Sequence, residues 1–213
     1  VAEEVLADGC SDLISMARPF LADPYFIRKA EQGRSDEINT CIGCNQACLD
    51  HTFSGKITSC LVNPRACNET ELKFVRTGAS KRIAVVGAGP AGLSFSTAAA
   101  ERGHQVTLFE AADDVGGQFN IAKKVPGKEE FYETLRYFRN HIKATGVNAK
   151  FNTRVTVEDL VKGGFDEIVL ATGVVPRTPP IEGVDHPKVL SYLDVLRDGK
   201  PVGKNVAVIG AGG

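Results

Sequence analysis

The stretch from Lys81 to Glu110, KRIAVVGAGPAGLSFSTAAAERGHQVTLFE, restricts the fold more than any other part of the chain. The apolar run over 83–86 is typical of a strand buried on both faces of a parallel sheet. Three glycines at G-x-G-x-x-G spacing follow, and an alanine-rich, helix-prone segment ends at Gly103, as glycine often ends helices. Residues 106–109 predict a second strand, which leads directly to Glu110.

Each glycine of this motif has its own mechanical role. Gly87 permits a tight turn out of the strand, Gly89 lets a pyrophosphate approach the backbone, and Gly92 lets the helix lie close to the sheet. The helix start supplies unpaired N–H groups and the positive end of the helix dipole. Glu110, at the tip of the second strand, is placed to accept both hydroxyls of an adenosine ribose. Because strand, turn, helix, strand and acid occur in the required order, we predict a dinucleotide-binding unit rather than an ordinary glycine-rich turn.

Composition excludes several classes of protein. The chain has 213 residues, 43% hydrophobic and 24% charged, with a formal net charge of −1. This is a soluble globular composition, long enough for more than one core, and the charge gives no sign of a nucleic-acid or membrane-surface partner. No apolar run approaches the roughly 18 residues of a transmembrane helix, and we expect no signal peptide. We expect a cytoplasmic protein that acts on a small molecule.

The first residues are typical of the last unit of a (β/α)8 barrel. Residues 1–9 predict a helix, and 12–17 predict a buried strand with Arg18 at its tip. Flavin and sugar phosphates bind near the ends of the last two strands of such barrels. Arg18 is therefore a candidate phosphate ligand, with a surface salt bridge as the alternative. Residues 21–34 predict a further helix, with Pro24 near its first turn.

A cysteine cluster follows the barrel-like segment. Six cysteines in a chain of this type, four of them close together, indicate a metal site rather than disulfides. A zinc ribbon more usually presents two separated C-x-x-C knuckles, so C-x2-C-x3-C with a distant fourth cysteine favours a [4Fe–4S] cluster over zinc. The predicted ligands are Cys41, Cys44, Cys48 and Cys60. Cys10 and Cys67 fit small buried apolar positions, and Cys67 is the second choice for the fourth ligand.

Two further glycine-containing turns indicate a bound dinucleotide. The pair Gly116–Gly117 follows Glu110 closely and keeps the backbone near a ligand. A predicted buried strand over 165–170 delivers the small turn Ala171-Thr172-Gly173. Other predicted elements are an amphipathic helix over 128–145, strands over 147–151 and 206–209, and a short helix over 191–197.

A second glycine motif, VAVIGAGG, closes the sequence at residues 206–213. It begins about 120 residues after the first, which favours two nucleotides, FAD at the first motif and a nicotinamide cofactor at the second. A strand followed by G-x-G with no helix after it cannot bury its faces. We therefore expect this chain to be a piece of a longer polypeptide.

Several segments together resemble the bacterial NADPH-dependent 2,4-dienoyl-CoA reductases, a family related to old yellow enzyme and trimethylamine dehydrogenase. The resemblance covers the whole chain but only the middle of that family's longer sequence, and the cysteine segment is its most specific part. The segments that carry it are CIGCNQAC (41–48), TSCLVNPR (58–65), GAGPAG (87–92), GGQFN (116–120), PGKEEF (126–131) and VLSYLD (189–194).

The resemblance implies a fold of three parts: the end of an FMN-binding (β/α)8 barrel (1–36), a [4Fe–4S] segment with a linker (37–80), and an incomplete Rossmann-like FAD domain (81–200) followed by the start of an NAD(P)-binding domain (201–213). Ala17 and Arg18 would contact the FMN phosphate, and Gln46 would lie near the FMN. Further residues would line the FAD site: Gly89, Ala91, Glu110, Gln118 and Val155. Gly210 and Gly212 would begin the NADPH site.

The implied mechanism is an electron relay for fatty acid oxidation. NADPH reduces FAD, the cluster passes electrons singly to FMN, and FMN reduces a 2,4-dienoyl-CoA. The family's substrate-protonating residues would lie in barrel strands that precede Val1. Three alternatives remain: an amine dehydrogenase or demethylase with the same relay in reverse, an electron-transfer FAD and iron–sulfur module, and a zinc-stabilised nucleotide-binding protein.

Overall fold

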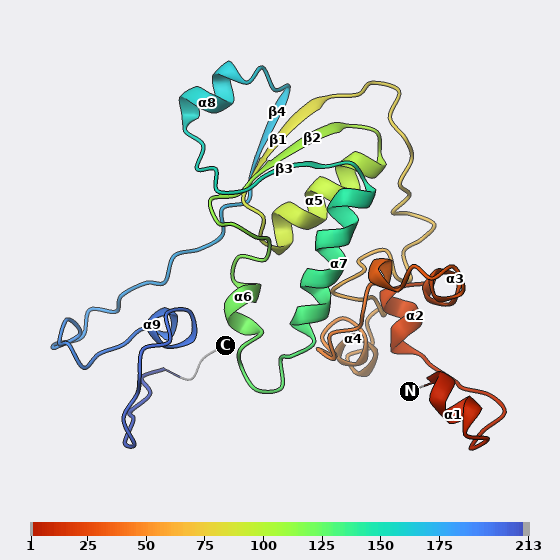
Figure 1. Cartoon of the computed structure of the whole chain (residues 1–213), viewed down its shortest axis with the longest axis horizontal. Coiled ribbons are helices and arrows are strands. Elements are labelled where there is room, and N and C mark those ends of the chain that lie inside the picture. Colours follow the sequence, from red (N-terminus) through yellow and green to blue (C-terminus); the bar gives the residue numbers. More distant parts are fainter. Residues whose placement is uncertain (1, 211–213) are drawn as a thin grey trace.

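The computed structural model describes residues 2–210, and its centre is a four-stranded sheet in the order β3-β2-β1-β4 (Figure 1). Every neighbouring pair of strands runs parallel. The strands are β1 (Arg82–Val86), β2 (Gln105–Phe109), β3 (Asn148–Lys150) and β4 (Glu167–Leu170). The predicted α/β class with a parallel sheet is confirmed.

Two helices cover one face of this sheet and pack against each other, α5 (Pro90–Glu101) and α7 (Phe131–Ala144). Their apolar side chains meet those of β1 and β2, and Leu93, Leu108 and Leu135 are almost fully buried there. Burial of one leucine side chain is worth about 2 kcal/mol, so this shared layer is the main hydrophobic core. The amphipathic helix predicted over 128–145 is therefore confirmed as α7.

Shorter helices surround this core. The N-terminal part contains α1 (Ala2–Ala7), α2 (Arg18–Ala22), α3 (Phe26–Glu31), the 3-10 helix η1 (Ser35–Glu37) and α4 (Leu49–Phe53). The remaining helices are α6 (Phe119–Ala122), α8 (Val157–Lys162) and α9 (Tyr192–Leu196). The short helix predicted over 191–197 is α9, and Ser191 and Asp194 form a capping box at its start.

The single helix predicted over 21–34 is wrong, because the chain breaks at Pro24 into α2 and α3. Asp23, the residue before the proline, is extended, with φ −144° and ψ 101°. A proline ring disfavours the helical conformation in the residue that precedes it, so a helix cannot run through this point without strain.

Two predicted strands are absent from the described residues. Residues 12–17 and 206–210 have no strand pairing, and Leu13 and Val208 are more than four-fifths exposed. Their sequences are apolar enough for strands, but a strand forms only where a neighbour accepts its backbone hydrogen bonds. Gly212 and the last part of the second glycine motif lie outside the described residues.

The strand predicted over 165–170 exists as β4, but the prediction that it is buried is wrong. Within residues 2–210, β4 pairs only with β1 and forms an edge of the sheet. Val169 packs against the core, whereas Ile168 is 44% exposed and Leu170 73% exposed. Successive side chains of a strand point to opposite faces, so only one face of β4 is covered here.

Stability should depend sharply on Gly92. A methyl group added there would lie 1.9 Å from the Gly87 carbonyl oxygen, so Gly92→Ala should destabilise the fold by about 3 kcal/mol or more. Urea unfolding measures the loss. Gly89→Ala is the matched control, because its methyl group meets no atom within 4 Å and its backbone is extended. Equal stability of the two variants would contradict this account of the turn.

Candidate dinucleotide site and cysteine pocket

The candidate dinucleotide site lies at the carboxyl ends of β1, β2 and β4, where three loops meet. Gly87, with φ +106°, turns the chain out of β1, and its N–H donates to the Phe109 carbonyl at the end of β2. The Ala171 N–H donates to the Val86 carbonyl, which brings the turn after β4 to the same place. A methyl group on Gly87 would lie 2.4 Å from the Ala171 oxygen, so only glycine fits between the strands.

Gly89 precedes α5 and faces open space. Its missing side chain leaves room, because an added methyl group would meet no atom within 4 Å. Gly117 approaches from the next loop, and its own added methyl group would lie 3.2 Å from the Gly89 Cα. Ala91 is exposed in the first turn of α5, while Gly92 is buried against the Gly87 turn. An open backbone at the start of a 12-residue helix is the feature that a pyrophosphate requires.

Glu110 has a structural role that sequence reasoning missed. Its Oε2 accepts the Ala88 N–H at 2.7 Å, and its Oε1 accepts the Ala112 N–H at 2.8 Å. The carboxylate thus joins the glycine turn to the loop after β2. Each oxygen keeps a second lone pair, so the predicted contact with ribose hydroxyls is compatible with this geometry. The signal available in the sequence was an acid aligned with the glycine turn across two neighbouring parallel strands.

The other predicted FAD residues lie on segments near this edge. The Gln118 side chain links two distant segments, because its Nε2 donates to the Val174 carbonyl and its Oε1 accepts the Tyr192 hydroxyl, both at 3.4 Å. The Thr153 N–H donates to the Glu110 carbonyl, which places the half-buried Val155 two residues from this contact. Thr172 and Gly173 are exposed in the turn after β4. The described part of the second motif, with Gly210, has no regular structure.

An ion pair fixes the loop that carries Gly116 and Gly117. The Arg139 guanidinium on α7 donates from Nε and Nη2 to both oxygens of Asp114. These hydrogen bonds hold the pKa of the Asp114 carboxyl below its ordinary value, against the opposing effect of partial burial. A methyl group on Gly116 would lie 2.7 Å from Leu135 Cδ2, so the loop packs directly on α7.

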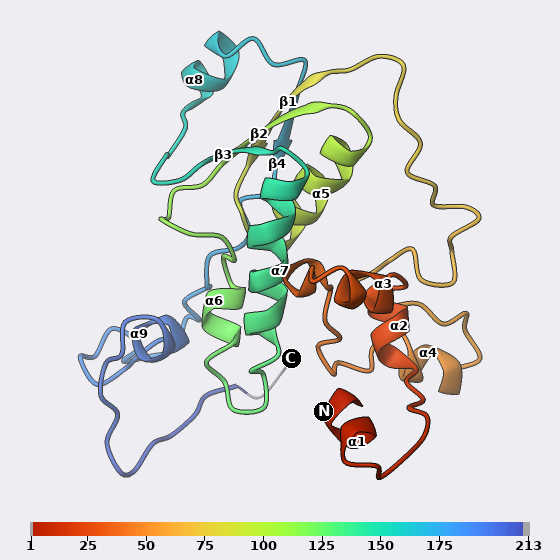
Figure 2. The same cartoon turned by 45° about the vertical axis from the view of Figure 1, so that its right-hand side comes forward.

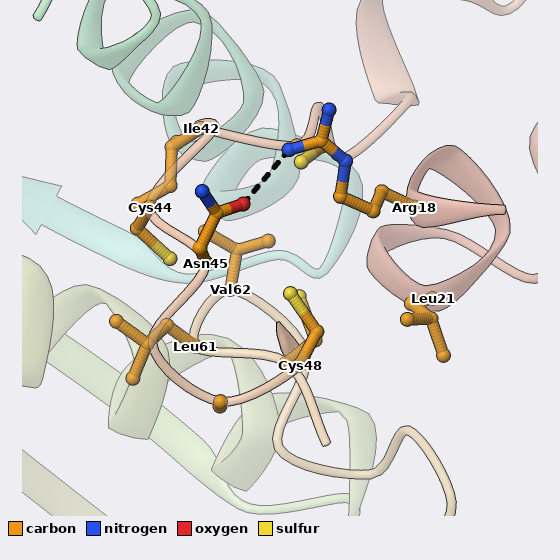
Figure 3. A pocket seen from close by; sticks show the side chains of 11 residues that line it. Arg18, Leu21, Ile42, Cys44, Asn45, Cys48, Leu61 and Val62 are labelled. Atoms are coloured by element: carbon orange, nitrogen blue, oxygen red, sulfur yellow. Dashed lines mark hydrogen bonds between the residues drawn. The ribbon is translucent and has the colours of Figure 1, made fainter. Parts of the chain in front are cut away.

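A separate pocket gathers four cysteines (Figure 3). Its lining includes Arg18 and four cysteines: Cys41, Cys44, Cys48 and Cys60. The Gly43 N–H approaches the Cys41 sulfur at 3.5 Å, a type of contact that stabilises thiolates in metal sites. Burial raises the pKa of the Cys60 thiol, and the neighbouring Cys41 and Cys44 add to that shift. Among residues 2–210, no group of three or more His, Cys, Asp or Glu side chains is arranged to hold a metal ion.

The predicted flavin-phosphate residue Arg18 lies beside the cysteines. Its Nη1 donates to the Asn45 Oδ1 at 2.9 Å, within the loop between Cys44 and Cys48 (Figure 3). Ala17 precedes α2, and its carbonyl accepts the Phe20 and Leu21 N–H groups. Gln46 is exposed on the cysteine loop and is not part of the pocket lining.

The prediction that Cys10 and Cys67 are buried is wrong, because both are exposed. Cys67 adopts φ +62° in a turn where its N–H donates to the Glu69 carboxylate, and this geometry turns the residue outward. Cys67 does not line the pocket, whereas Cys60 does.

The fold and the glycine turn define an α/β dinucleotide-binding oxidoreductase. Residues 81–213, more than half of the sequence, match the pyridine nucleotide-disulphide oxidoreductase family, and the chain belongs to that family. Members bind FAD and NAD(P), so the predicted cofactor class of this unit is confirmed.

Within residues 2–210, no helix is both long and apolar enough to cross a membrane.

Similar proteins include reductases and amine dehydrogenases. A metal reductase of Desulforamulus reducens is 42% identical over all of this chain, which corresponds to 32% of the relative. A solved 2-naphthoyl-CoA reductase with bound 2-naphthoyl-CoA is 38% identical, with a TM-score of 0.91 over 95% of this chain and 31% of its own. Histamine dehydrogenase from Rhizobium sp. 4-9 is 31% identical, with a TM-score of 0.80 over 93% of this chain and 31% of its own. The chain thus spans about a third of the length of the curated relatives it matches.

Glu110→Ala should weaken both the turn and the cofactor site. Two N–H groups would lose their acceptor, one of them on the fully buried Ala88, and the expected loss of stability is about 1–3 kcal/mol. FAD affinity should fall as well, measured by fluorescence titration of the apoprotein. The control Asp113→Ala removes an exposed neighbouring acid and should change neither quantity. Unchanged stability in Glu110→Ala would refute the bridging role.

The Asp114–Arg139 pair should add stability that acid removes. Since the folded-state pKa of Asp114 is depressed, the contribution is present above the unfolded pKa of about 3.9 and is lost as the pH falls below it. The pair is partly exposed, so the difference should be at most about 1 kcal/mol. Urea unfolding of wild type and Asp114→Asn should differ at pH 6 and converge near pH 3. Parallel curves over this range would contradict the assignment.

Proposed function

We propose that this chain is the electron-input part of an NADPH-dependent flavoprotein reductase whose acceptor is a 2,4-dienoyl-CoA. The observation that carries this proposal is that one chain contains both a pocket shared by Arg18 and four cysteines and an FAD-type glycine turn. A simple nicotinamide dehydrogenase needs only the turn, so the cysteines call for a second redox group.

The FAD would occupy the loops at the carboxyl edge of the sheet. The open backbone at Gly89 would receive the pyrophosphate, and the bridged carboxylate of Glu110 would accept the ribose hydroxyls. Gly87, Gly92 and Gly117 would shape the loops around the FAD and make few direct contacts with it. Five further residues would complete the site: Ala91, Gln118, Ala171, Thr172 and Gly173. Val155, beside Glu110, and Gly210, in the second motif, would contribute to the FAD and NADPH sites respectively, with Gly212 beyond the described residues.

The cysteine pocket would hold a [4Fe–4S] cluster through its four thiolates. Zinc sites with four cysteines more usually present two separated C-x-x-C pairs, so the spacing of the four pocket cysteines favours the cluster over structural zinc. The Gly43 N–H at the Cys41 sulfur and the positive charge of Arg18 would both favour the anionic thiolates.

Arg18 and Ala17 would bind the phosphate of FMN, with Gln46 nearby. The FMN phosphate would then lie next to the cysteine pocket, because Arg18 contacts Asn45 between two of the cysteines. When bound, FAD would take two electrons from NADPH, the cluster would carry them one at a time, and FMN would deliver them to the substrate. In sum, a hydride from NADPH and one proton reduce one carbon–carbon double bond and leave NADP+.

An amine dehydrogenase with the same core is the second candidate, favoured by the similarity to histamine dehydrogenase. Electrons would then travel from the amine toward the FAD. The two functions differ in the donor: anaerobic NADPH bleaches the flavins of a reductase, whereas a methylamine donor bleaches those of a dehydrogenase.

Cys48→Ser in the holoenzyme should separate the two redox groups. Loss of one of four thiolates should remove most of the iron and the reduction of 2,4-dienoyl-CoA by NADPH, while FAD reduction by NADPH survives. Iron analysis and anaerobic stopped-flow absorbance measure these quantities. Cys67→Ser, an exposed cysteine outside the pocket, is the matched control and should keep both. A Cys48→Ser protein with full iron content and acyl-CoA reduction would refute the cluster assignment.

A further inference from the structure

The three residues before Cys41 form a junction between the cysteine pocket and the sheet unit. On one side, Arg136 of α7 donates from Nη2 to the Ile38 carbonyl at 3.0 Å and to the Thr40 Oγ1 at 3.2 Å. Its Nη1 donates to the Ser35 carbonyl at 3.1 Å. Figure 2 shows the segment that follows α3 reaching the middle of α7. One partly buried guanidinium thus holds the chain at three points just before the first cysteine.

The residue between these contacts faces the other way. The Asn39 N–H donates to the Asp23 Oδ2 at 2.9 Å, and its Nδ2 donates to the carbonyl of Val62, a residue of the pocket lining, at 2.7 Å. Asp23 is only 3% exposed and is also paired with Lys29 at 2.6 Å. Alternate residues of 38–40 therefore bind α7 on one side and the α2 and pocket loops on the other.

The same helix also contacts the candidate FAD site. Leu135, next to Arg136 in sequence, packs against Gly116, and Arg139 one turn later holds Asp114 in that loop. Leu135 is anchored in the core at 1% exposure, so α7 cannot shift without disturbing the sheet unit. The two sites are therefore held by the same rigid helix. The FAD loop contacts α7 through Leu135 and Arg139, and the cysteine segment contacts it through Arg136.

An arginine suits this position for a chemical reason. The guanidinium offers five N–H donors in a fixed plane. Here it serves two acceptors of the junction and the Ser35 carbonyl just before it, while its Nε donates to Glu133 on the same helix. A lysine has one flexible ammonium and cannot hold the same set at once. The ion pair with Glu133 holds the Arg136 side chain in the orientation that contacts the junction.

We propose that Arg136 is a positioning residue for electron transfer, which sets the place of the cysteine pocket relative to the FAD loops. This inference rests on the proposed function, because it assumes that electrons pass between the two sites. Electron transfer slows steeply as the distance between the two groups grows, so release of the junction should be visible in the transfer rate.

The test compares Arg136→Met and Arg136→Lys in the holoenzyme, with Asn140→Ala as control. Methionine keeps much of the unbranched apolar stem but has no donors. Asn140, one turn further along α7, donates to the Arg136 carbonyl at 3.1 Å within the helix and reaches the 35–40 segment only by a 3.4 Å contact with the Asp36 carbonyl, so its loss should leave the junction in place. After NADPH is mixed anaerobically with each protein, stopped-flow absorbance follows FAD reduction and then cluster reduction.

In Arg136→Met, we expect normal iron and FAD content, normal FAD reduction and unchanged midpoint potentials, but cluster reduction slowed by about threefold or more because the two sites are less well positioned. Arg136→Lys should recover part of the rate. Hydrogen exchange at 35–41 should rise in both variants, which reports release of the junction independently of activity. A purely structural role would lower cofactor content or stability without a selective loss in this one step.

Two outcomes overturn the inference, and they are distinguishable. A wild-type holoenzyme that contains iron, together with an Arg136→Met rate within twofold of wild type, removes the positioning role and leaves the proposed function intact. A wild-type protein free of iron defeats the proposed function and the inference with it. If Arg136→Met lost its iron, Arg136→Lys would decide the question, because an unchanged rate in that iron-loaded variant with raised exchange at 35–41 would also refute the positioning role.

Discussion

The close approach of α5 to the turn out of β1 is the constraint on which the rest of the structure depends. The Gly92 backbone lies so near the Gly87 carbonyl that no side chain fits between them, and Ala171 closes the same space from β4. This contact fixes the start of α5 at the carboxyl edge of the sheet. The N–H groups of its first turn and the open backbone at Gly89 then face the place where a dinucleotide phosphate would bind.

Hydrogen bonds to two carboxylates stabilise this edge in addition to apolar packing. Glu110 joins the glycine turn to the next loop, and Asp114 joins that loop to α7. Glu110 accepts from the N–H of the fully buried Ala88, and Asp114 accepts from the Arg139 guanidinium, so each carboxylate adds order where the chain has several glycines. The sheet thus supplies a rigid base, and two carboxylates determine the shape of the loops above it.

The sheet unit was predictable because its signals are local. The apolar run before Gly87, the glycine spacing and the stripe of α7 each depend on neighbouring residues, and β1, α5, β2 and α7 all form close to where they were expected. Pro24 was also visible in the sequence, but it was placed near the first turn of a single helix, where proline is tolerated. The exposed face of β4 and the unpaired 12–17 segment depend on which partners lie nearby, and local patterns carry no such information.

The predicted site residues also depended on whether their signals were local in the sequence. Spacing grouped Cys41, Cys44 and Cys48, which lie within eight residues, and ranked Cys60 above Cys67 as the fourth. The structure places Cys60 in the pocket lining and Cys67 outside it. Arg136 was invisible, because its acceptors Ser35, Ile38 and Thr40 lie about 100 positions earlier and two of them are backbone carbonyls. Backbone acceptors leave no trace in residue identity, so a contact of this kind emerges only from three-dimensional coordinates.

The one-sided pairing of β4 has a practical consequence for handling these residues in solution. A strand that exposes unpaired backbone groups beside Ile168 and Leu170 is a template for another strand, including the same strand of a second copy. Protein in which this edge of β4 stays unpaired would tend to aggregate as its concentration rises. A lysine in place of Ile168 would introduce a charge that opposes such stacking and would leave the core-facing Val169 untouched.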